Sequence, residues 1–259
     1  MVLIKTFFAW AYTMFSLFFF IPFGLSAFLL GFLGLRKPMT WVTYRLAQAW
    51  AKGIIFITGC SLVVTGRENI PKKGAVCFVS NHVGLFDIIL ALANIGRPFG
   101  FVAKKELLSL PFFNMWIYML GGLFIDRKNI RKAIKTINLG ISKIQKGSSM
   151  LIFPEGTRSK GHGLLPFRSG AVKLATNSLA PIVPIAIAGS YEVFEKDYRV
   201  HAAPVRMVFC PLIDTASMSP DDRRHKLADQ VRSIIEAELE KEEGLTQGTP
   251  GTQSSENDL

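Results

Sequence analysis

The chain has 259 residues, of which 49% are hydrophobic, and its formal net charge is +11 at pH 7. This length allows one large α/β domain with a buried core and a short additional segment, but leaves too little chain for a second full domain. The combination of basic and hydrophobic character favours a membrane surface as partner and argues against nucleic acid, because anionic headgroups attract Lys and Arg near the surface.

Residues 6–35 form an uncharged, apolar stretch with basic residues on both sides. It is longer than the ~20 residues that cross a bilayer once. Pro22 and Gly24 lie near its middle, so the stretch forms either one long tilted span or two short helices that enter one leaflet and return. The basic flanks favour the second arrangement, because both ends then stay on the cytoplasmic side. A cleaved signal peptide is the alternative, since residues 24–27 resemble a cleavage site.

Residues 39–58 stay apolar but add basic and aromatic side chains, a mixture typical of a helix at the level of the lipid headgroups. The first acidic residue of the chain is Glu68. We therefore expect residues 1–58 to be helices that anchor the protein to the inner (cytoplasmic) membrane, with the rest of the chain on the cytoplasmic side. The alternative is a pair of hydrophobic helices that pack on the domain.

Residues 59–243 are expected to form one domain of alternating strands and helices. The predicted strands are 75–80, 99–103, 120–126, 150–153, 182–188 and 205–213, and helices are predicted at 130–146 and 170–178. This alternation predicts the α/β class, with a mostly parallel sheet flanked by helices. Ser219 is the predicted N-cap of a final helix that runs to about residue 243. Residues 244–259 are polar without periodicity and are expected to be a disordered tail.

A histidine and a carboxylate follow the first long strand of this domain. The strand 75–80 leads directly into Asn81 and His82, and Asp87 comes five residues after the histidine. Ligands bind at the carboxyl ends of strands in open α/β sheets. A carboxylate that accepts from one ring nitrogen fixes the tautomer and leaves the other nitrogen free as a base. A turn must bring the two together, and the alternative is that Asp87 caps a helix and His82 is an ordinary loop residue.

A second polar segment, residues 153–159, follows the strand 150–153. Its glycine, Gly156, lets backbone approach a ligand, Thr157 offers a hydroxyl, and the planar guanidinium of Arg158 can bind two phosphate oxygens at once. A surface turn with a solvated arginine is the ordinary alternative.

Basic residues stand at the ends of two more strands. Lys104 and Lys105 follow the strand 99–103, and Arg127 follows the strand 120–126. Because the carboxyl ends of parallel strands share one edge, these cations are expected near His82. The three cysteines and four histidines are dispersed. They lack the spacing of a disulfide framework or of a metal site, so reduced thiols and no bound metal are expected.

Together these segments resemble the PlsC-type 1-acylglycerol-3-phosphate acyltransferases. The family's His-x-x-x-x-Asp motif is matched by His82 and Asp87, preceded by Asn81. The further family blocks are matched by residues 104–107 (Lys-Lys-Glu-Leu), 121–127 (Gly-Gly-Leu-Phe-Ile-Asp-Arg), 153–159 (Phe-Pro-Glu-Gly-Thr-Arg-Ser) and 183–185 (Val-Pro-Ile). Their order and spacing over residues 66–210 argue against chance similarity.

The resemblance implies a mechanism and a set of site residues. His82 would remove the proton from the sn-2 hydroxyl of lysophosphatidic acid, Asp87 would orient the imidazole, and the hydroxyl would attack an acyl thioester without an acyl-enzyme intermediate. The residues expected at the substrate are Asn81, Lys104, Arg127, Glu155, Gly156, Thr157 and Arg158.

The expected product is phosphatidic acid, an intermediate of phospholipid biosynthesis. No cofactor is expected, because acyl-CoA or acyl carrier protein would supply the acyl group, and the expected partners are lysophosphatidic acid, the donor and membrane phospholipids. Alternatives are an acyltransferase for another acceptor, such as glycerol 3-phosphate, another lysophospholipid or a lyso-aminolipid, or a non-catalytic membrane lipid sensor.

Overall fold

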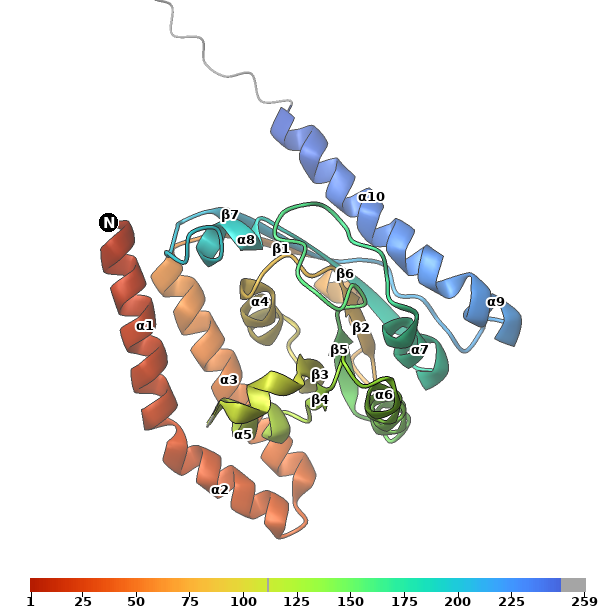
Figure 1. The fold of residues 1–259 in the computed structure, drawn as a ribbon, viewed down its shortest axis with the longest axis horizontal. Coiled ribbons are helices and arrows are strands. Elements are labelled where there is room, and N and C mark those ends of the chain that lie inside the picture. The colour runs from red at the N-terminus through yellow and green to blue at the C-terminus, as the bar shows by residue number, and fades with distance from the viewer. Residues whose placement is uncertain (111, 248–259) are drawn as a thin grey trace, which may run out of the picture.

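The computed structural model describes residues 1–110 and 112–247 (Figure 1). The chain starts with three helices, α1 (Val2–Phe19), α2 (Ile21–Phe32) and α3 (Arg36–Thr58). The strands that follow are β1 (Ser61–Thr65), β2 (Cys77–Ser80), β3 (Phe99–Lys104), β4 (Leu123–Ile125), β5 (Ser149–Ile152), β6 (Ile182–Ala188) and β7 (Pro204–Phe209). The later helices are α4 (Phe86–Asn94), α5 (Phe113–Met119), α6 (Ile130–Gln145), α7 (Ser169–Ser178), α8 (Ser190–Phe194), α9 (Pro220–His225) and α10 (Leu227–Gln247), with 3-10 turns at Arg67–Asn69 and Lys105–Ser109.

Within these described residues the strands form one seven-stranded sheet in the order β1-β7-β6-β2-β5-β3-β4. Neighbouring strands run parallel, except that β6 and β7 are antiparallel. The predicted α/β class with a mostly parallel sheet is confirmed. Three predicted strands are shorter than expected, and the first of them, β2, begins at Cys77 and not at residue 75. Residues 120–122 form the turn after α5, where Gly121 has a φ of +84°, and β7 ends at Phe209, before Pro211, which lacks the N–H that a strand ladder needs.

The sheet buries both faces because its central strands are apolar on both sides. In β2, Phe78 packs into a core with α3 and α4, whereas Val79 points to the opposite core with α6, α7 and α10. Leu151 and Ile152 of β5 divide in the same way. Figure 1 shows α3 and α4 on one side of the sheet and α6, α7 and α10 on the other. Side chains alternate along a strand, so a two-faced core needs the continuous apolar runs that the sequence has here.

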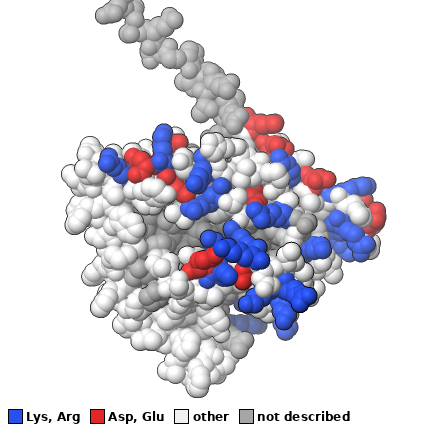
Figure 2. All heavy atoms as spheres, viewed as in Figure 1, with Lys and Arg blue, Asp and Glu red and all other residues white. Residues whose placement is uncertain are grey.

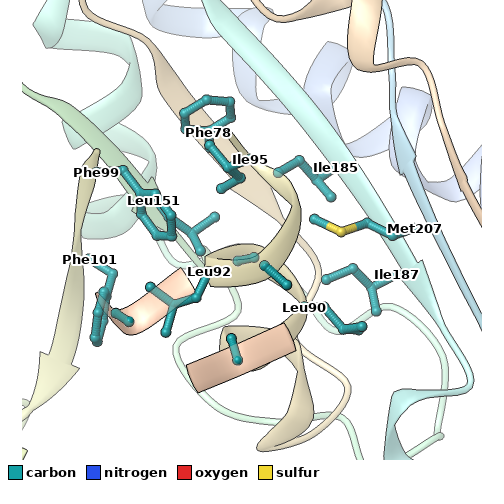
Figure 3. Close-up of a cluster of buried hydrophobic side chains, with 14 of the residues drawn as sticks. Phe78, Leu90, Leu92, Ile95, Phe99, Phe101, Leu151, Ile185, Ile187 and Met207 are labelled. Atoms are coloured by element: carbon teal, nitrogen blue, oxygen red, sulfur yellow. The ribbon is translucent and has the colours of Figure 1, made fainter. Parts of the chain in front are cut away.

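The first core holds the segment that follows β2. Figure 3 shows Leu90 and Leu92 of α4 among Phe78, Leu151 and Ile185 of the sheet. Each of these side chains is buried, and fully burying a large apolar side chain contributes about 1.5–3 kcal/mol. The start of α4, and hence the loop between β2 and α4, is therefore fixed on a rigid base.

The N-terminal helices pack on the domain and expose much apolar surface. α1 and α2 both contact α3, which packs on α4. Among the described residues, no single helix has both the length and the apolar character to cross a bilayer. Val2–Ser16 and Ile21–Phe32 meet those criteria only as a pair bent by 43°.

The end of the chain is partly described. The single final helix predicted after Ser219 is instead two helices. Ser219 is the N-cap of α9, which ends at His225, and α10 begins at Leu227 and continues past the expected end at residue 243 to Gln247. The rest of the predicted disordered tail, residues 248–259, lies outside the described residues. The division into residues 1–58, 59–243 and 244–259 stays a prediction, although α3 ends at Thr58.

Candidate active site

The histidine and aspartate after β2 are in direct contact. Residues 81–85 form a loop between β2 and α4, and Asp87 lies in the first turn of α4. This turn brings Nδ1 of His82 to 2.7 Å from Oδ2 of Asp87. The distance is that of a strong hydrogen bond to a carboxylate. Because Nδ1 is engaged, Nε2 is the ring nitrogen left for another partner.

Asp87 is held in one orientation by its own loop and by the residue that starts α8. The side chain is fully buried. Its Oδ2 also accepts from the backbone N–H groups of Val83 at 2.7 Å and Gly84 at 3.0 Å, and its Oδ1 accepts from the hydroxyl of Ser190. Both carboxylate oxygens accept hydrogen bonds from these groups. In the contact between the two side chains, Asp87 is therefore the acceptor and the Nδ1–H of His82 the donor.

The imidazole lies on an aromatic ring. The rings of His82 and Phe153 are stacked at a centroid distance of 4.1 Å and an interplanar angle of 21°. Phe153 directly follows β5, which pairs with β2. The side chain of His82 keeps 17% of its surface exposed. The ring is thus fixed by a hydrogen bond at one nitrogen and by stacking on one face, yet it stays accessible.

Glu155 joins the two loops of the site. Its Oε1 accepts from the backbone N–H of His82 at 2.6 Å and its Oε2 from that of Leu165 at 3.0 Å. The side chain is buried, and this burial raises the pKa of the Glu155 carboxyl above its usual value, although the two backbone N–H donors oppose the shift. Two backbone hydrogen bonds also connect the loops. The N–H of Ser159 donates to the carbonyl oxygen of His82, and the N–H of Lys160 donates to that of Val83. Glu155 therefore shapes the site, and its direct contact with substrate stays a prediction.

Arg158 is already paired within the protein. Its Nη1 lies 2.5 Å from Oε1 of Glu195, whose Oε2 accepts from the backbone N–H of Leu85 at 2.8 Å. Glu195 follows α8 and is 3% exposed, whereas Arg158 is 34% exposed. The pair ties the segment after β5 to the His82 loop. The guanidinium of Arg158 is thus bound to a buried carboxylate, and its expected role at the phosphate stays a prediction.

Arg168 is a further cation at this edge of the sheet. Its Nε donates to the carbonyl oxygen of Glu155 at 3.1 Å. Its side chain lies over Gly156, whose φ is +67° and where an added Cβ would come within 2.6 Å of Cδ of Arg168. The positive φ favours glycine at this position, and a larger residue would also have to displace the Arg168 side chain. Thr157, next to it, is exposed.

Arg127 and Arg168 lie close enough to interact electrostatically. Arg127 follows β4 and is exposed, and partial desolvation together with the positive charge of Arg168 lowers the pKa of its guanidinium. Among the described residues, Arg127 forms no ion pair. The negative charge of Glu106 opposes part of the lowering of the Arg127 pKa. Like charges that approach without a counterion favour an anion between them.

The two lysines after β3 differ in their partners. Nζ of Lys105 lies 2.8 Å from Oδ2 of Asp126, so this side chain belongs to a local ion pair. Nζ of Lys104 lies 3.6 Å from Oε1 of Glu106, and the Lys104 side chain is exposed. Of the two, Lys104 is therefore freer to reach a ligand.

Asn81 is engaged with the scaffold. Its Nδ2 donates to the carbonyl oxygen of Ile187 at 2.8 Å, and its Oδ1 accepts from the N–H of the same residue at 2.8 Å. The side chain is buried. These bonds continue the pairing of β2 with β6 past the end of β2. Asn81 thus has a scaffolding role, and its contact with substrate stays a prediction.

Four residues of the site were not expected from the sequence as parts of it. They are Phe153, Arg168, Ser190 and Glu195. Phe153 stood inside a recognised motif, and its position directly after a strand was a usable signal. Ser190 comes after Gly189, the glycine that follows β6, and this is a weaker signal. Nothing local in the sequence marks Arg168 or Glu195.

Comparisons with known proteins agree with this geometry. Residues 61–188 match the family described as Acyltransferase. A 1-acyl-sn-glycerol-3-phosphate acyltransferase of Borreliella burgdorferi is 30% identical over 200 residues, 77% of this chain and 80% of that protein. One from Escherichia coli is 37% identical over 173 residues, 65% of this chain and 70% of that protein. The crystal structure of the LPA acyltransferase PlsC from Thermotoga maritima is similar at a TM-score of 0.78 and 25% identity, covering 93% of this chain and 95% of that one.

Proposed function

The chain belongs to the family of 1-acyl-sn-glycerol-3-phosphate acyltransferases, and we propose that it acylates the sn-2 hydroxyl of 1-acylglycerol 3-phosphate from a thioester donor, producing phosphatidic acid. The observation that carries the proposal is the contact of His82 with Asp87 at the carboxyl end of β2, in which Nδ1 of the ring is engaged and Nε2 has no partner among residues 1–110 and 112–247. This is the arrangement that general-base activation of an alcohol requires.

Proton transfer follows from the hydrogen bonds of the pair. Nδ1–H of His82 donates to Asp87, which fixes the tautomer with a lone pair on Nε2. Nε2 accepts the proton of the acceptor hydroxyl as its oxygen attacks the thioester carbonyl. Asp87 stabilises the imidazolium that forms, and its buried bonds to Val83, Gly84 and Ser190 keep it from turning away.

The second half of the reaction returns that proton. The tetrahedral intermediate collapses, the carbon–sulfur bond breaks, and the departing thiolate takes the proton from Nε2 of His82. The acyl group moves directly to the acceptor oxygen, so the lipid hydroxyl stands where a protein serine stands in a triad. The donor is acyl-CoA or acyl carrier protein, and the reaction needs no resident cofactor.

The acceptor phosphate binds between Arg127 and Arg168, with Lys104 at the rim. Lys104 is the last residue of β3, Arg127 follows the neighbouring parallel strand β4, and Arg168 lies over Gly156 after the next strand, β5. A phosphate dianion relieves the repulsion of the two guanidiniums and accepts charge-assisted hydrogen bonds from both. Binding there holds the sn-2 hydroxyl at a fixed reach from the phosphate.

The N-terminal helices dock this site on the cytoplasmic face of the inner membrane. Large apolar side chains of α1 and α2 are exposed, among them Phe7, Phe8, Phe15, Phe18, Phe28, Leu29 and Phe32. At about 25 cal/mol per Å² of apolar surface removed from water, their burial in lipid outweighs what basic side chains add at ~1 kcal/mol each. A high-salt wash should therefore leave the protein in the membrane fraction, and release by salt would contradict this docking.

One assay tests the proposed reaction. Purified protein in detergent micelles is given palmitoyl-CoA and, in turn, 1-acylglycerol 3-phosphate, 1-acylglycerol, glycerol 3-phosphate and a lysophosphatidylcholine. The expected result is acylation at the sn-2 position with the highest kcat/KM for 1-acylglycerol 3-phosphate. Turnover of another acceptor without turnover of 1-acylglycerol 3-phosphate would overturn the proposal.

A further inference from the structure

The segment between Asp126 and Glu155 is basic throughout. Residues 127–154 contain no Asp or Glu. Their cations are Arg127, Lys128, Arg131, Lys132, Lys135, Lys143 and Lys146. Most of these residues lie on α6 or directly beside it. This charge is more than the phosphate site uses, because only Arg127 of this set belongs to that site.

One face of α6 joins basic and apolar side chains. Ile130 and Ile134 are 75% and 54% exposed, and Arg131 and Lys135 are exposed as well. Residues four apart lie on one stripe of a helix, so the two isoleucines form one stripe and the two cations the next. We call these four residues and Lys128, which precedes the helix, the α6 face. An apolar stripe edged by cations is compatible with a protein interface, in which the apolar contact is central and the rim is polar.

The cations of the α6 face are available to an outside partner. Within residues 1–110 and 112–247, no ion pair joins Lys128, Arg131 or Lys135 to an acidic side chain. Figure 2 shows Lys and Arg gathered where α6 lies, apart from the white surface over α1 and α2. The α6 face also starts next to Arg127, so a partner seated on it lies beside the phosphate site.

From these observations we infer that the α6 face docks the acyl donor's carrier, a small acidic acyl carrier protein. The inference rests on the proposed acyl transfer, which needs a thioester donor at His82. The face is the convex side of a helix, whereas small ligands such as coenzyme A bind in concave sites. An acidic protein surface complements the cations, and the exposed isoleucines give it apolar contact. The apolar surface of α1 and α2 lies elsewhere and is the better candidate for contact with lipid.

The test compares two donors on charge-reversed variants. Arg131→Glu with Lys135→Glu removes the basic stripe, and negative charges in the first turns of a helix do not oppose its dipole. Lys72→Glu with Lys73→Glu is the matched control, with the same change of net charge in the exposed loop before β2, at the opposite edge of the sheet. Turnover is measured in micelles with palmitoyl-CoA and with a bacterial acyl carrier protein loaded with palmitate.

The expected result is selective for the carrier. Electrostatic steering raises association rates by about 10- to 1,000-fold, so kcat/KM with the loaded carrier should fall at least about 10-fold in the α6 variant. It should change less than about 2-fold with palmitoyl-CoA, and the control should resemble wild type. Ile134→Ser alone should also impair the carrier more than palmitoyl-CoA, because it removes apolar contact without changing charge.

Several results would overturn the inference. They are an equal loss with both donors, an equal loss in the control, or a wild-type enzyme that cannot use the loaded carrier. Normal use of both donors with weakened binding to vesicles of phosphatidylcholine and phosphatidylglycerol would instead assign the α6 face to the membrane. Activity with palmitoyl-CoA distinguishes these outcomes from failure of the proposed function, which would abolish transfer from both donors in wild type.

Discussion

Replacing Asn81 with alanine separates a scaffold role from substrate binding. The change removes two 2.8 Å hydrogen bonds to the N–H and the carbonyl oxygen of Ile187, at a position that is 3% exposed. Each buried backbone group left without a partner costs about 1–3 kcal/mol, so Asn81→Ala should lower the free energy of unfolding by about 2–6 kcal/mol. Asn81→Asp keeps one acceptor but sets a second carboxylate oxygen against the carbonyl of Ile187. Only its protonated form can restore the lost donor.

The assay for both Asn81 variants is urea denaturation followed at several pH values, together with acceptor KM. In Asn81→Asp, burial and the facing carbonyl raise the pKa of the introduced carboxyl in the folded state. The stability of this variant should therefore be greatest below the pKa of the unfolded chain and be lost as pH rises through the folded value. Near-normal stability of Asn81→Ala combined with a raised acceptor KM would refute the scaffold role and place Asn81 at the substrate.

Three further variants test the residues around the pair. Arg158→Met should lower the free energy of unfolding by about 1–3 kcal/mol, less than for a fully buried pair because Arg158 is 34% exposed, and Glu195→Gln on that background should restore part of it in urea denaturation. Burial raises the pKa of Glu155 above its usual 4.5, so the folded wild type loses stability as pH rises from 4.5 toward the raised value. Glu155→Gln carries no such ionisable group, and its free energy of unfolding should therefore increase relative to that of wild type over this pH range. A difference between the two proteins that does not change with pH would contradict this. Arg168→Gln should raise the KM for 1-acylglycerol 3-phosphate about 10- to 100-fold, because a hydrogen bond to a charged group contributes ~1.5–3 kcal/mol. The KM for palmitoyl-CoA should stay unchanged. A rise only in the KM for palmitoyl-CoA would instead assign Arg168 to the thioester site.

The part of the site that lies on strand ends could be predicted from the sequence. The apolar runs of β2, β3 and β5 mark parallel strands, and parallel strands bring their carboxyl ends to one edge. His82 and Arg127 were therefore expected near one another although they are far apart in the chain. The His82–Asp87 contact depended in addition on a turn, and residues 81–85 form it.

The partners of these residues could not be predicted, because they come from segments without a local pattern. Arg158 looks from its sequence like a free phosphate ligand, but its partner Glu195 is 37 residues away. Ser190, which holds Asp87, is 103 residues from it. A sequence pattern shows which side chains are available at an edge, whereas packing decides which of them already have a partner.

For the N-terminal segment, the sequence was compatible with one long helix or with two short ones, and helix propensity alone could not decide between them. The structure has two helices, α1 and α2, which break at Phe20 and pack on α3. Pro22 lies in the first turn of α2, where a missing N–H costs nothing, so it starts a helix rather than interrupting one. This position accounts for a break two residues earlier than the proline itself.

The most direct test of the account is the turnover of His82→Ala, Asp87→Asn and the double variant with saturating palmitoyl-CoA and 1-acylglycerol 3-phosphate. If His82 is the general base and Asp87 orients it, His82→Ala should lower kcat by about 10²- to 10⁴-fold. Asp87→Asn should also be severely impaired, and the double variant should be about as poor as the worse single one, because the two residues act as a unit. Circular dichroism should show folded protein throughout. Near-normal turnover of folded His82→Ala, or losses that multiply in the double variant, would contradict the account.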